Sequence, residues 1–206
     1  YPIPFTLVAD FLSTPPELLQ KIPPIPQPKD PMERALISTV EIITSSSKGS
    51  GCLVSAEGHI LTNYHVIQDF SGSPQEELFV GVSLSQLLPS EELFRAQLID
   101  SSQELDLALL KITSGLYQQP LPEGYTFPYV PRGDDKALRM GDTLFMLGYP
   151  GIGGTGTRVS LTLTKGVVSG FEFHPRGFLI KTDGEMNFGS SGGGAMNAQY
   201  QLIGLP

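Results

Sequence analysis

The chain has 206 residues, 40% of them hydrophobic and 17% charged, which excludes a disordered protein and fits one ordinary domain or two small ones. Thirteen basic residues against 21 acidic ones leave a net charge of −8, which argues against nucleic acid or an anionic membrane as the main partner. No apolar run reaches the roughly 18 residues of a membrane-spanning helix, so no transmembrane segment is expected. The single cysteine, Cys52, excludes an internal disulfide framework and is expected to be a buried, unreactive thiol.

Proline is concentrated at the start of the chain, where residues 1–31 contain nine of the 18. This composition predicts an extended, semi-rigid lead-in, and a ligand for a proline-binding module is an alternative interpretation. Asp30, Pro31 and Glu33 then form a helix-capping pattern, because the acidic side chain can accept backbone hydrogen bonds and proline fits the first turn. A short helix is therefore predicted over 33–38.

Short runs of β-branched and aromatic residues, separated by Gly, Ser or Pro, follow the helix and predict strands. The first series covers 38–44, 51–55, 59–63, 77–84, 93–100 and 107–112. A second series covers 142–149, 160–170, 177–183, 193–197 and 200–205. Two groups of five or six strands predict an all-β fold of two packed antiparallel β-barrels. The expected boundaries are a Pro-rich lead-in over 1–31, an N-terminal barrel over 32–115, a connector over 116–137 and a C-terminal barrel over 138–206.

Two glycine-rich segments formally match signatures of other folds. GIGGTG, residues 151–156, matches G-x-G-x-x-G, but a strand pattern follows it, whereas a dinucleotide site needs a helix whose N-terminus receives the pyrophosphate. We expect a flexible glycine loop there. GSSGG, residues 189–193, matches the nucleophile elbow of α/β-hydrolases, which place their acid and histidine after the serine. No His, Asp or Glu follows Ser191, so that interpretation fails.

The remaining combination of reactive residue types runs His, Asp, Ser along the chain. His65 closes the apolar run ILTNYHV, whereas His59 and His174 fall in a turn and a loop, where we expect solvated side chains. Asp106 has mostly apolar neighbours, where an acid is costly unless it is hydrogen-bonded. Ser191 lies among glycines, whose backbone can approach a substrate closely. Each residue alone has an ordinary structural interpretation, but their distribution over both predicted barrels favours a shared site.

Four segments in matching order resemble motifs of the trypsin-like serine proteases, and within them of the HtrA/Deg branch. They are GSGCLVSAEGHILTNYHVI, DLALLKI, MGDTLFMLGYP and KTDGEMNFGSSGGGAMNAQYQLIGL. The resemblance covers about residues 33–205 and implies two six-stranded, chymotrypsin-like barrels with a catalytic site between them. It also implies one more barrel strand beyond Pro206, which we expect to be missing from this chain.

The resemblance implies that His65 is the general base, Asp106 the acid that orients it, and Ser191 the nucleophile. A serine hydroxyl needs a base to take its proton, and an imidazole held by a buried carboxylate can do so near neutral pH. The backbone N–H groups of Gly189 and Ser191 correspond to the family's oxyanion hole. Glu185, six residues before Ser191, corresponds to the base of the primary specificity pocket, where it would favour Arg or Lys before the cut. A solvent-facing Glu185 is the alternative, which we favour.

We therefore predict a serine endopeptidase that hydrolyses protein or peptide substrates, expected to be unfolded, through an acyl-enzyme intermediate. A catalytically weak, protease-like binding or chaperone module for unfolded segments is the alternative. No metal or cofactor is expected. The family further implies homo-oligomers and export to a periplasm, cell surface or exterior. Ser190 stands where digestive trypsins have an Asp that pairs with a newly formed N-terminus, so activation by N-terminal cleavage is not expected.

Overall fold

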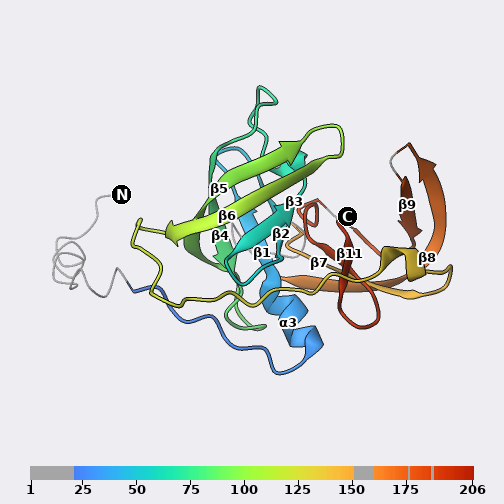
Figure 1. The fold of residues 1–206 in the computed structure, drawn as a ribbon, viewed down its shortest axis with the longest axis horizontal. Helices are drawn as coiled ribbons and strands as arrows, with labels where there is room; N and C mark the ends of the chain where they lie inside the picture. The colour runs from blue at the N-terminus through green and yellow to red at the C-terminus, as the bar shows by residue number, and fades with distance from the viewer. Residues whose placement is uncertain (1–20, 151–159, 176, 187) are drawn as a thin grey trace, which may run out of the picture.

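The computed structural model of the chain describes residues 21–150, 160–175, 177–186 and 188–206, and these form a β-rich fold with a single short α-helix (Figure 1). The first barrel consists of β1 (Thr39–Ile43), β2 (Lys48–Leu53), β3 (His59–Thr62), β4 (Glu77–Val82), β5 (Glu91–Ser102) and β6 (Leu107–Gly115). The second sheet consists of β7 (Thr143–Gly148), β8 (Thr162–His174), β9 (Gly177–Thr182), β10 (Gly194–Met196) and β11 (Leu202–Gly204). Helix α3 (Pro31–Ser38) and two short 3-10 turns, η1 (Tyr64–Val66) and η2 (Asp135–Ala137), complete the elements. Every predicted strand segment contains a strand, which confirms the all-β prediction.

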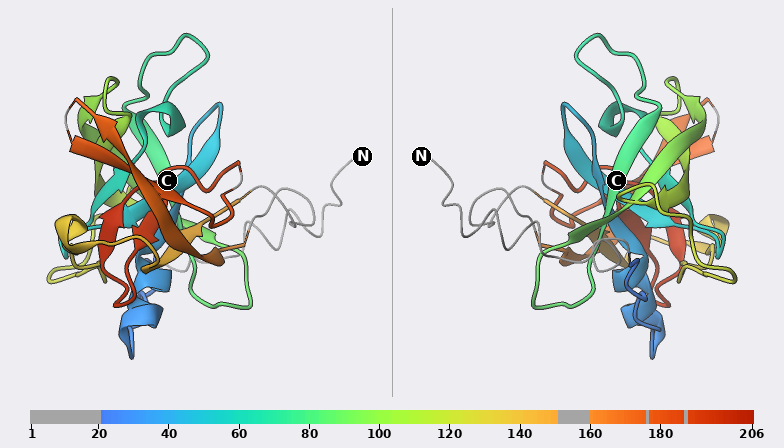
Figure 2. Two further views of the ribbon diagram at one scale, coloured as in Figure 1. Left: turned by 90° about the vertical axis from the view of Figure 1, so that its right-hand side faces the viewer. Right: turned by 90° about the vertical axis from the view of Figure 1, so that its left-hand side faces the viewer.

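Helix α3 starts where the capping pattern places it. The Asp30 carboxylate accepts a hydrogen bond from the Glu33 backbone N–H at 2.8 Å, and the Glu33 carboxylate accepts one from the Lys29 N–H at 2.6 Å. These bonds satisfy N–H groups near the helix start that have no partner within the helix. The helix ends at Ser38 and continues directly into β1, because Thr39 is already extended. Figure 2 shows α3, in blue, at one end of the molecule.

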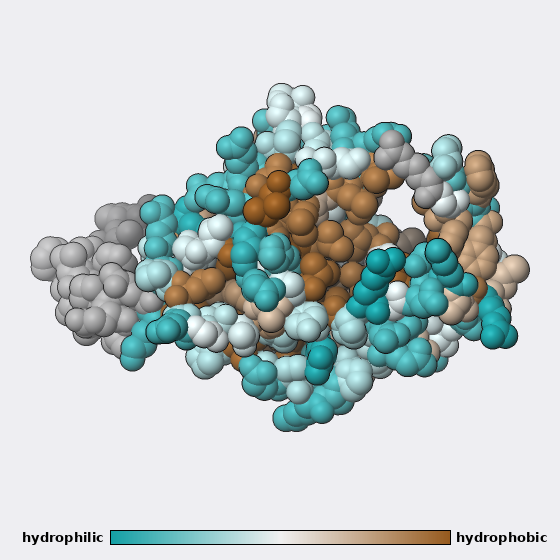
Figure 3. Space-filling view, in the orientation of Figure 1, coloured by the Kyte–Doolittle hydropathy of each residue, from teal (hydrophilic) through white to brown (hydrophobic). Residues whose placement is uncertain are grey.

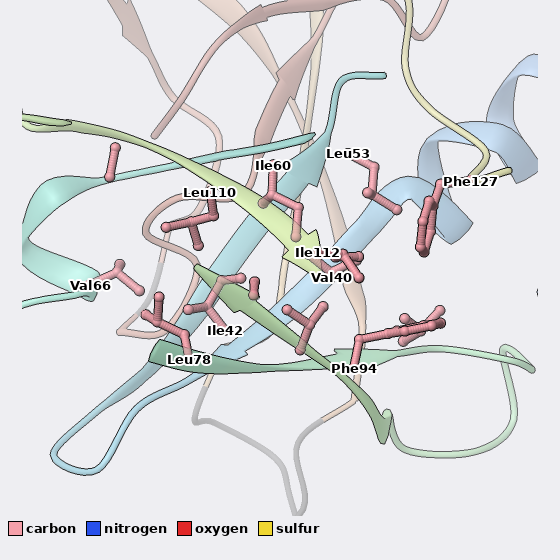
Figure 4. Close-up of a cluster of buried hydrophobic side chains, with 14 of the residues drawn as sticks. Val40, Ile42, Leu53, Ile60, Val66, Leu78, Phe94, Leu110, Ile112 and Phe127 are labelled. Atoms are coloured by element: carbon pink, nitrogen blue, oxygen red, sulfur yellow. The ribbon is translucent and has the colours of Figure 1, made fainter. Parts of the chain in front are cut away.

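The first barrel is closed, with the strand order β1-β2-β3-β6-β5-β4 and antiparallel pairing throughout. Strand β6 shows how the sequence produces it, because Ala108, Leu110 and Ile112 are buried and alternate with more exposed residues. The side chains that fill the barrel come from all six strands and from neighbouring segments (Figure 4). Closure pairs every strand on both sides, so this barrel has no free strand edge.

The lead-in and the connector both contribute to the core of the first barrel. Ile25 is 6% exposed and belongs to that core, and the Tyr125 hydroxyl donates to the Pro23 carbonyl at 3.1 Å. Phe127, in the connector, packs edge-on against Phe94 of β5 with ring centroids 5.3 Å apart. From there the connector runs to the second sheet, as the yellow-green segment in Figure 1 shows. The described part of the lead-in is therefore extended, as expected, but it is also packed against the barrel.

The second unit is a half-barrel. Its described strands form one five-stranded sheet in the order β11-β10-β7-β8-β9, one strand fewer than six, and together with the closed barrel it confirms the chymotrypsin-like double barrel that the resemblance implied. The core of this sheet contains the buried side chains of Leu144, Met146 and Val168. The second half of β8 pairs with β9 to form a long hairpin, whose exposed apolar side chains colour the right-hand edge of Figure 3. The motif at 151–156 lies outside the described residues.

The two units meet along the outer face of β1 and β2. In these strands nearly every residue is buried, because one face lies in the barrel core and the other lies against the second unit. Cys52 on β2 packs in a cluster with Leu147 of β7 and Met196 of β10. Tyr149, which follows β7, is 2% exposed, and its hydroxyl donates to the Thr39 carbonyl at 3.2 Å. Burial, and secondarily the nearby Glu41 carboxylate, raises the pKa of the Tyr149 phenol. Apolar packing and a few direct hydrogen bonds thus join the barrel to the half-barrel.

Candidate active site

His65 and Asp106 are brought together by two hydrogen bonds. The Asp106 Oδ2 lies 2.8 Å from the His65 Nδ1, and the Oδ1 accepts from the His65 backbone N–H at 2.9 Å. A carboxylate accepts hydrogen bonds, so in the neutral imidazole Nδ1 carries the proton and Nε2 keeps its lone pair. The short turn η1 places His65 beyond the end of β3, and antiparallel pairing of β3 with β6 brings the Asp106 turn alongside. The pair therefore holds one imidazole tautomer in a fixed direction.

Asp106 adopts an uncommon backbone conformation at the end of the turn before β6. Its φ of 52° lies in the left-handed region, which Asp tolerates better than most residues that have a side chain. The side chain is 46% exposed and that of His65 is 50% exposed. The expectation of a buried carboxylate was therefore wrong, because Asp106 lies on a turn rather than within the strand. The desolvation of the Asp106 carboxylate therefore costs little stability, since water solvates part of the charge.

Ser191 lies on a glycine-rich loop that is packed tightly against the first barrel. Gly189 and Gly192 have φ angles of 96° and 80°, which favour glycine. A side chain at Gly192 would collide with the Ser50 carbonyl and the Thr62 hydroxyl, so only glycine fits there. We expected these glycines to admit a substrate. At Gly192, the structure shows that the missing side chain admits the backbone of β2 instead.

Two polar side chains of the first barrel tie this loop in place. The Asn63 side-chain amide donates to the Asp106 carbonyl at 3.0 Å, and its Oδ1 accepts from the Gly192 N–H at 2.6 Å. The Ser50 hydroxyl donates to the Gly189 carbonyl at 2.6 Å, and the Ser50 N–H donates to the Ser191 carbonyl at 2.9 Å. Neither Asn63 nor Ser50 was expected to have a role at this site. Their only signal was their place inside the motif that ends at His65.

The backbone N–H groups of Gly189 and Ser191 are the predicted oxyanion hole. Within the ranges that the structure describes, neither N–H has an acceptor. The Ser190 carbonyl accepts from the Gly193 N–H at 3.0 Å, and in a planar trans peptide the Ser191 N–H points the opposite way. Among the same residues, no hydrogen bond joins His65 to Ser191. The structure thus unites the acid with the base, and it anchors the serine loop separately.

An open pocket lies directly beside the serine. It is lined by Met186, Phe188, Ser190, Ser191 and Pro206. Met186 is 49% exposed and Phe188 is 93% exposed, so the pocket presents apolar side chains to solvent. Glu185 is exposed and does not belong to the lining, and its carbonyl accepts a hydrogen bond from the Thr164 hydroxyl at 2.9 Å.

The other candidate residues lie away from this arrangement. The Cys52 thiol is fully buried, which confirms the expected burial, and this burial raises its pKa to about 12. His59, the first residue of β3, is half-buried and bonded to the Ser55 hydroxyl at 2.7 Å, so it is not simply solvated. His174 is the last residue of β8 rather than part of a loop. No group of His, Cys, Asp and Glu suited to a metal ion occurs in the described portion of the chain.

Comparison with known proteins gives consistent matches. A model of the trypsin-like peptidase domain family matches residues 49–205. A "probable periplasmic serine endoprotease DegP-like" of Bartonella henselae is 33% identical over 162 residues, which cover 76% of this chain and 27% of that protein. The "serine endoprotease DegS" of Salmonella typhimurium is 29% identical over 164 residues, covering 76% of this chain and 38% of that protein.

Among solved structures, that of Deg5 superimposes with a TM-score of 0.66 at 27% identity, covering 85% of this chain and 81% of that one. The chain spans about a quarter of the length of the DegP-like relatives that it matches. The family match covers most of the chain, and the fold and motif order agree with it. This chain belongs to the trypsin-like peptidase family, on the HtrA/Deg side of that family.

Proposed function

We propose that the chain is the peptidase unit of a serine endopeptidase, with Ser191 as nucleophile, His65 as general base and Asp106 as the acid that orients the base. The observation that carries the proposal is the two-point contact between Asp106 and His65, which leaves Nε2 of the imidazole free to accept a proton. Membership of the trypsin-like peptidase family supports the same assignment.

Catalysis begins when the Ser191 Oγ attacks the carbonyl carbon of the scissile peptide bond and its proton passes to Nε2 of His65. Asp106 stabilises the imidazolium that forms, because its carboxylate accepts the Nδ1–H bond. The amine then leaves and takes the proton from His65, which yields an acyl-enzyme. Water attacks the ester with the same histidine as base, so the serine is regenerated and the free acid is released.

The negative charge that develops on the substrate carbonyl oxygen needs fixed donors. The N–H groups of Gly189 and Ser191 supply them, since neither has an acceptor among the residues described. Asn63 supports the arrangement, because one amide group contacts both the Asp106 turn and the serine loop. Preorganised donors of this kind stabilise the transition state without further rearrangement.

A fluorophosphonate probe tests the proposal directly. We expect labelling of Ser191 in the wild-type chain, located by peptide mass spectrometry, and no labelling of a Ser191→Ala variant with the same melting temperature. Ser190→Ala is the matched control, because Ser190 is adjacent to the nucleophile and has no assigned chemical role. Absence of labelling in folded wild-type protein would contradict the enzyme assignment and favour the module that binds unfolded segments without cleaving them.

The substrate preference that we propose is an extended, unfolded polypeptide. Glu185 is exposed, and the open pocket beside Ser191 is lined instead by Met186 and Phe188, which supports the solvent-facing alternative for Glu185. A peptide library compared between wild type and Glu185→Ala tests this. An unchanged preference before the cut is expected, whereas a lost preference for Arg or Lys would restore Glu185 to the pocket base.

Export and self-association are further parts of the proposal. Matching relatives are named periplasmic serine endoproteases, which supports export of the protein to which this chain belongs. No helix in the described ranges is long and apolar enough to cross a membrane. Cell fractionation tests export, and sedimentation of the purified chain tests the homo-oligomer that the family resemblance implies. A cytoplasmic location would contradict export, and a strict monomer would contradict self-association.

A further inference from the structure

One buried side chain of the first barrel, Ser50, contacts the serine loop and a second segment of the half-barrel together. Ser50 is 0% exposed, and its hydroxyl donates to the Gly189 carbonyl at 2.6 Å while accepting from the Tyr149 N–H at 2.8 Å. Its own N–H donates to the Ser191 carbonyl at 2.9 Å, and its carbonyl accepts from the Thr62 hydroxyl at 2.7 Å. Ser50 therefore links β2 to the loop on one side and to the end of β7 on the other.

We propose that Ser50 is a positioning residue, whose hydroxyl fixes the loop of Gly189–Ser191 so that its N–H groups form the oxyanion hole. This inference rests on the proposed function. The carbonyls of Gly189, Ser190 and Ser191 all have hydrogen-bond donors within the protein, and Ser50 supplies two of the three. In a planar trans peptide, the Ser190 carbonyl, which accepts from the Gly193 N–H, directs the Ser191 N–H the opposite way. The two Ser50 bonds hold the peptides on either side of that one, so they fix the backbone from which the N–H groups of Gly189 and Ser191 project.

The packing around Ser50 explains why a small change there would be felt in the loop. A Cβ atom at Gly148 would lie 2.9 Å from the Ser190 Cα and 3.0 Å from the Ser50 Oγ, so loop, hydroxyl and β7 are already in close contact. Loss of the hydroxyl removes one of the contacts that hold the loop against β2 and the end of β7, so the loop is free to shift. A donor displaced by a fraction of an ångström binds the oxyanion less well, because such interactions depend steeply on distance and angle.

Loss of the hydroxyl also leaves two backbone groups without their partner. The Tyr149 N–H and the Gly189 carbonyl both bond to the Ser50 Oγ. The Gly189 carbonyl recovers a partner when its peptide turns toward solvent or another donor, since a carbonyl without a hydrogen bond is unfavourable. Turning that peptide reorients the backbone of the loop that carries the nucleophile. The effect of the substitution is therefore expected on the transition state rather than on substrate binding.

The test is the kinetics of Ser50→Ala with a peptide substrate, normalised by active-site titration and measured well below the melting temperature. We expect kcat to fall about 10- to 100-fold with KM changed less than about threefold, because misplaced catalytic groups reduce turnover by such factors. Inhibition by a peptide boronate, which forms a tetrahedral adduct with the serine, should weaken by the same factor as kcat/KM. If Ser50 only stabilised the fold, the variant would lose stability, but kcat/KM and boronate affinity would not fall by the same factor.

Two further variants make the result decisive. Ser38→Ala removes another fully buried hydroxyl, one with no hydrogen-bond partner in the described structure, and should keep wild-type kcat. Ser50→Cys keeps the side-chain volume but offers only a weak hydrogen-bond donor, so it should also lose kcat, and it decides the question if Ser50→Ala does not fold. Wild-type kcat and boronate affinity in the folded Ser50 variants would overturn the inference about Ser50 but leave the proposed function standing. Absence of turnover in the wild-type chain would overturn the proposed function and this inference with it.

Discussion

The first barrel and the half-barrel reach different degrees of closure with strands of similar composition. The first barrel pairs every strand on both sides and buries a core drawn from all six strands and from flanking segments. In the half-barrel, β9 and β11 are edge strands of the described sheet, and its own buried cluster contains only Leu144, Met146 and Val168. The closed barrel carries the His65–Asp106 pair, whereas the half-barrel carries the serine loop. Several of the loop's bonds run to the closed barrel, so the better-packed unit positions the candidate catalytic residues of both.

The largest effect is expected from removing the proposed nucleophile, which the half-barrel carries. Ser191→Ala should lower kcat by roughly six orders of magnitude, because the remaining groups cannot form an acyl-enzyme. The free energy of unfolding should stay within about 0.5 kcal/mol, since a partly exposed hydroxyl is lost. Hydrolysis of an unfolded protein substrate, measured by gel and by peptide release, checks the loss. Near-wild-type activity would remove the half-barrel from the chemistry altogether.

The matching change in the closed barrel is Asp106→Asn. The amide can present its N–H₂ group to His65, which favours the wrong imidazole tautomer, and kcat should fall by about 10⁴. The fold should be retained, because the side chain is half exposed and the turn before β6 tolerates Asn at positive φ. Steady-state kinetics across pH measures the change. A loss below about tenfold would mean that Asp106 does not orient the base.

A matched pair of leucines compares the two cores directly. Leu110→Ala in the closed barrel should cost about 4 kcal/mol of unfolding free energy, near the upper part of the range for buried leucines. Leu144→Ala in the half-barrel should cost about 2.5 kcal/mol, because an open sheet can relax around the cavity. Urea unfolding followed by circular dichroism gives both values. Equal losses would show that closure does not govern the stability of the two cores.

A smaller loss of stability is expected from a substitution in the lead-in. Ile25→Ala should cost about 2 kcal/mol, because the side chain is 6% exposed within the core of the closed barrel. Met32→Ala, whose side chain is 41% exposed, is the control and should be nearly neutral. Thermal unfolding of both variants measures the difference. A neutral Ile25→Ala would show that the lead-in only lies on the surface of the barrel.

The smallest effect concerns the junction of the two units. Cys52 should not react with iodoacetamide at pH 8 in folded protein, because its thiol is buried and its pKa is raised to about 12. Between its ordinary value of 9.0 and about 12, the folded state keeps a proton that the unfolded state loses, so stability should fall as pH rises through that window. Mass spectrometry follows the labelling. Rapid labelling of native protein would show that the junction opens easily.

Local sequence patterns predicted most of the secondary structure. The strand periodicity of segments such as 107–112 and the capping pattern at Asp30 depend on neighbours in the chain, so they could be found without the fold. The order His65, Asp106, Ser191 was also visible, because residue type and motif resemblance are properties of the chain. The exposure of Asp106 could not be predicted, since it depends on a turn conformation, whereas its apolar neighbours in the sequence indicated burial.

By itself, the sequence determined the strands, the short helix and the three residues of the proposed triad. Tertiary structure decided how they are held. The contacts of Ser50 with Gly189 and of Asn63 with Gly192 join residues 139 and 129 positions apart, and no local pattern encodes such a pairing. Tertiary structure also requires glycine at position 192, because a Cβ atom there would collide with the backbone of another strand. Hydrogen bonds and steric contacts between distant segments exist only once the barrel has closed, and for that reason they could not be predicted from the chain.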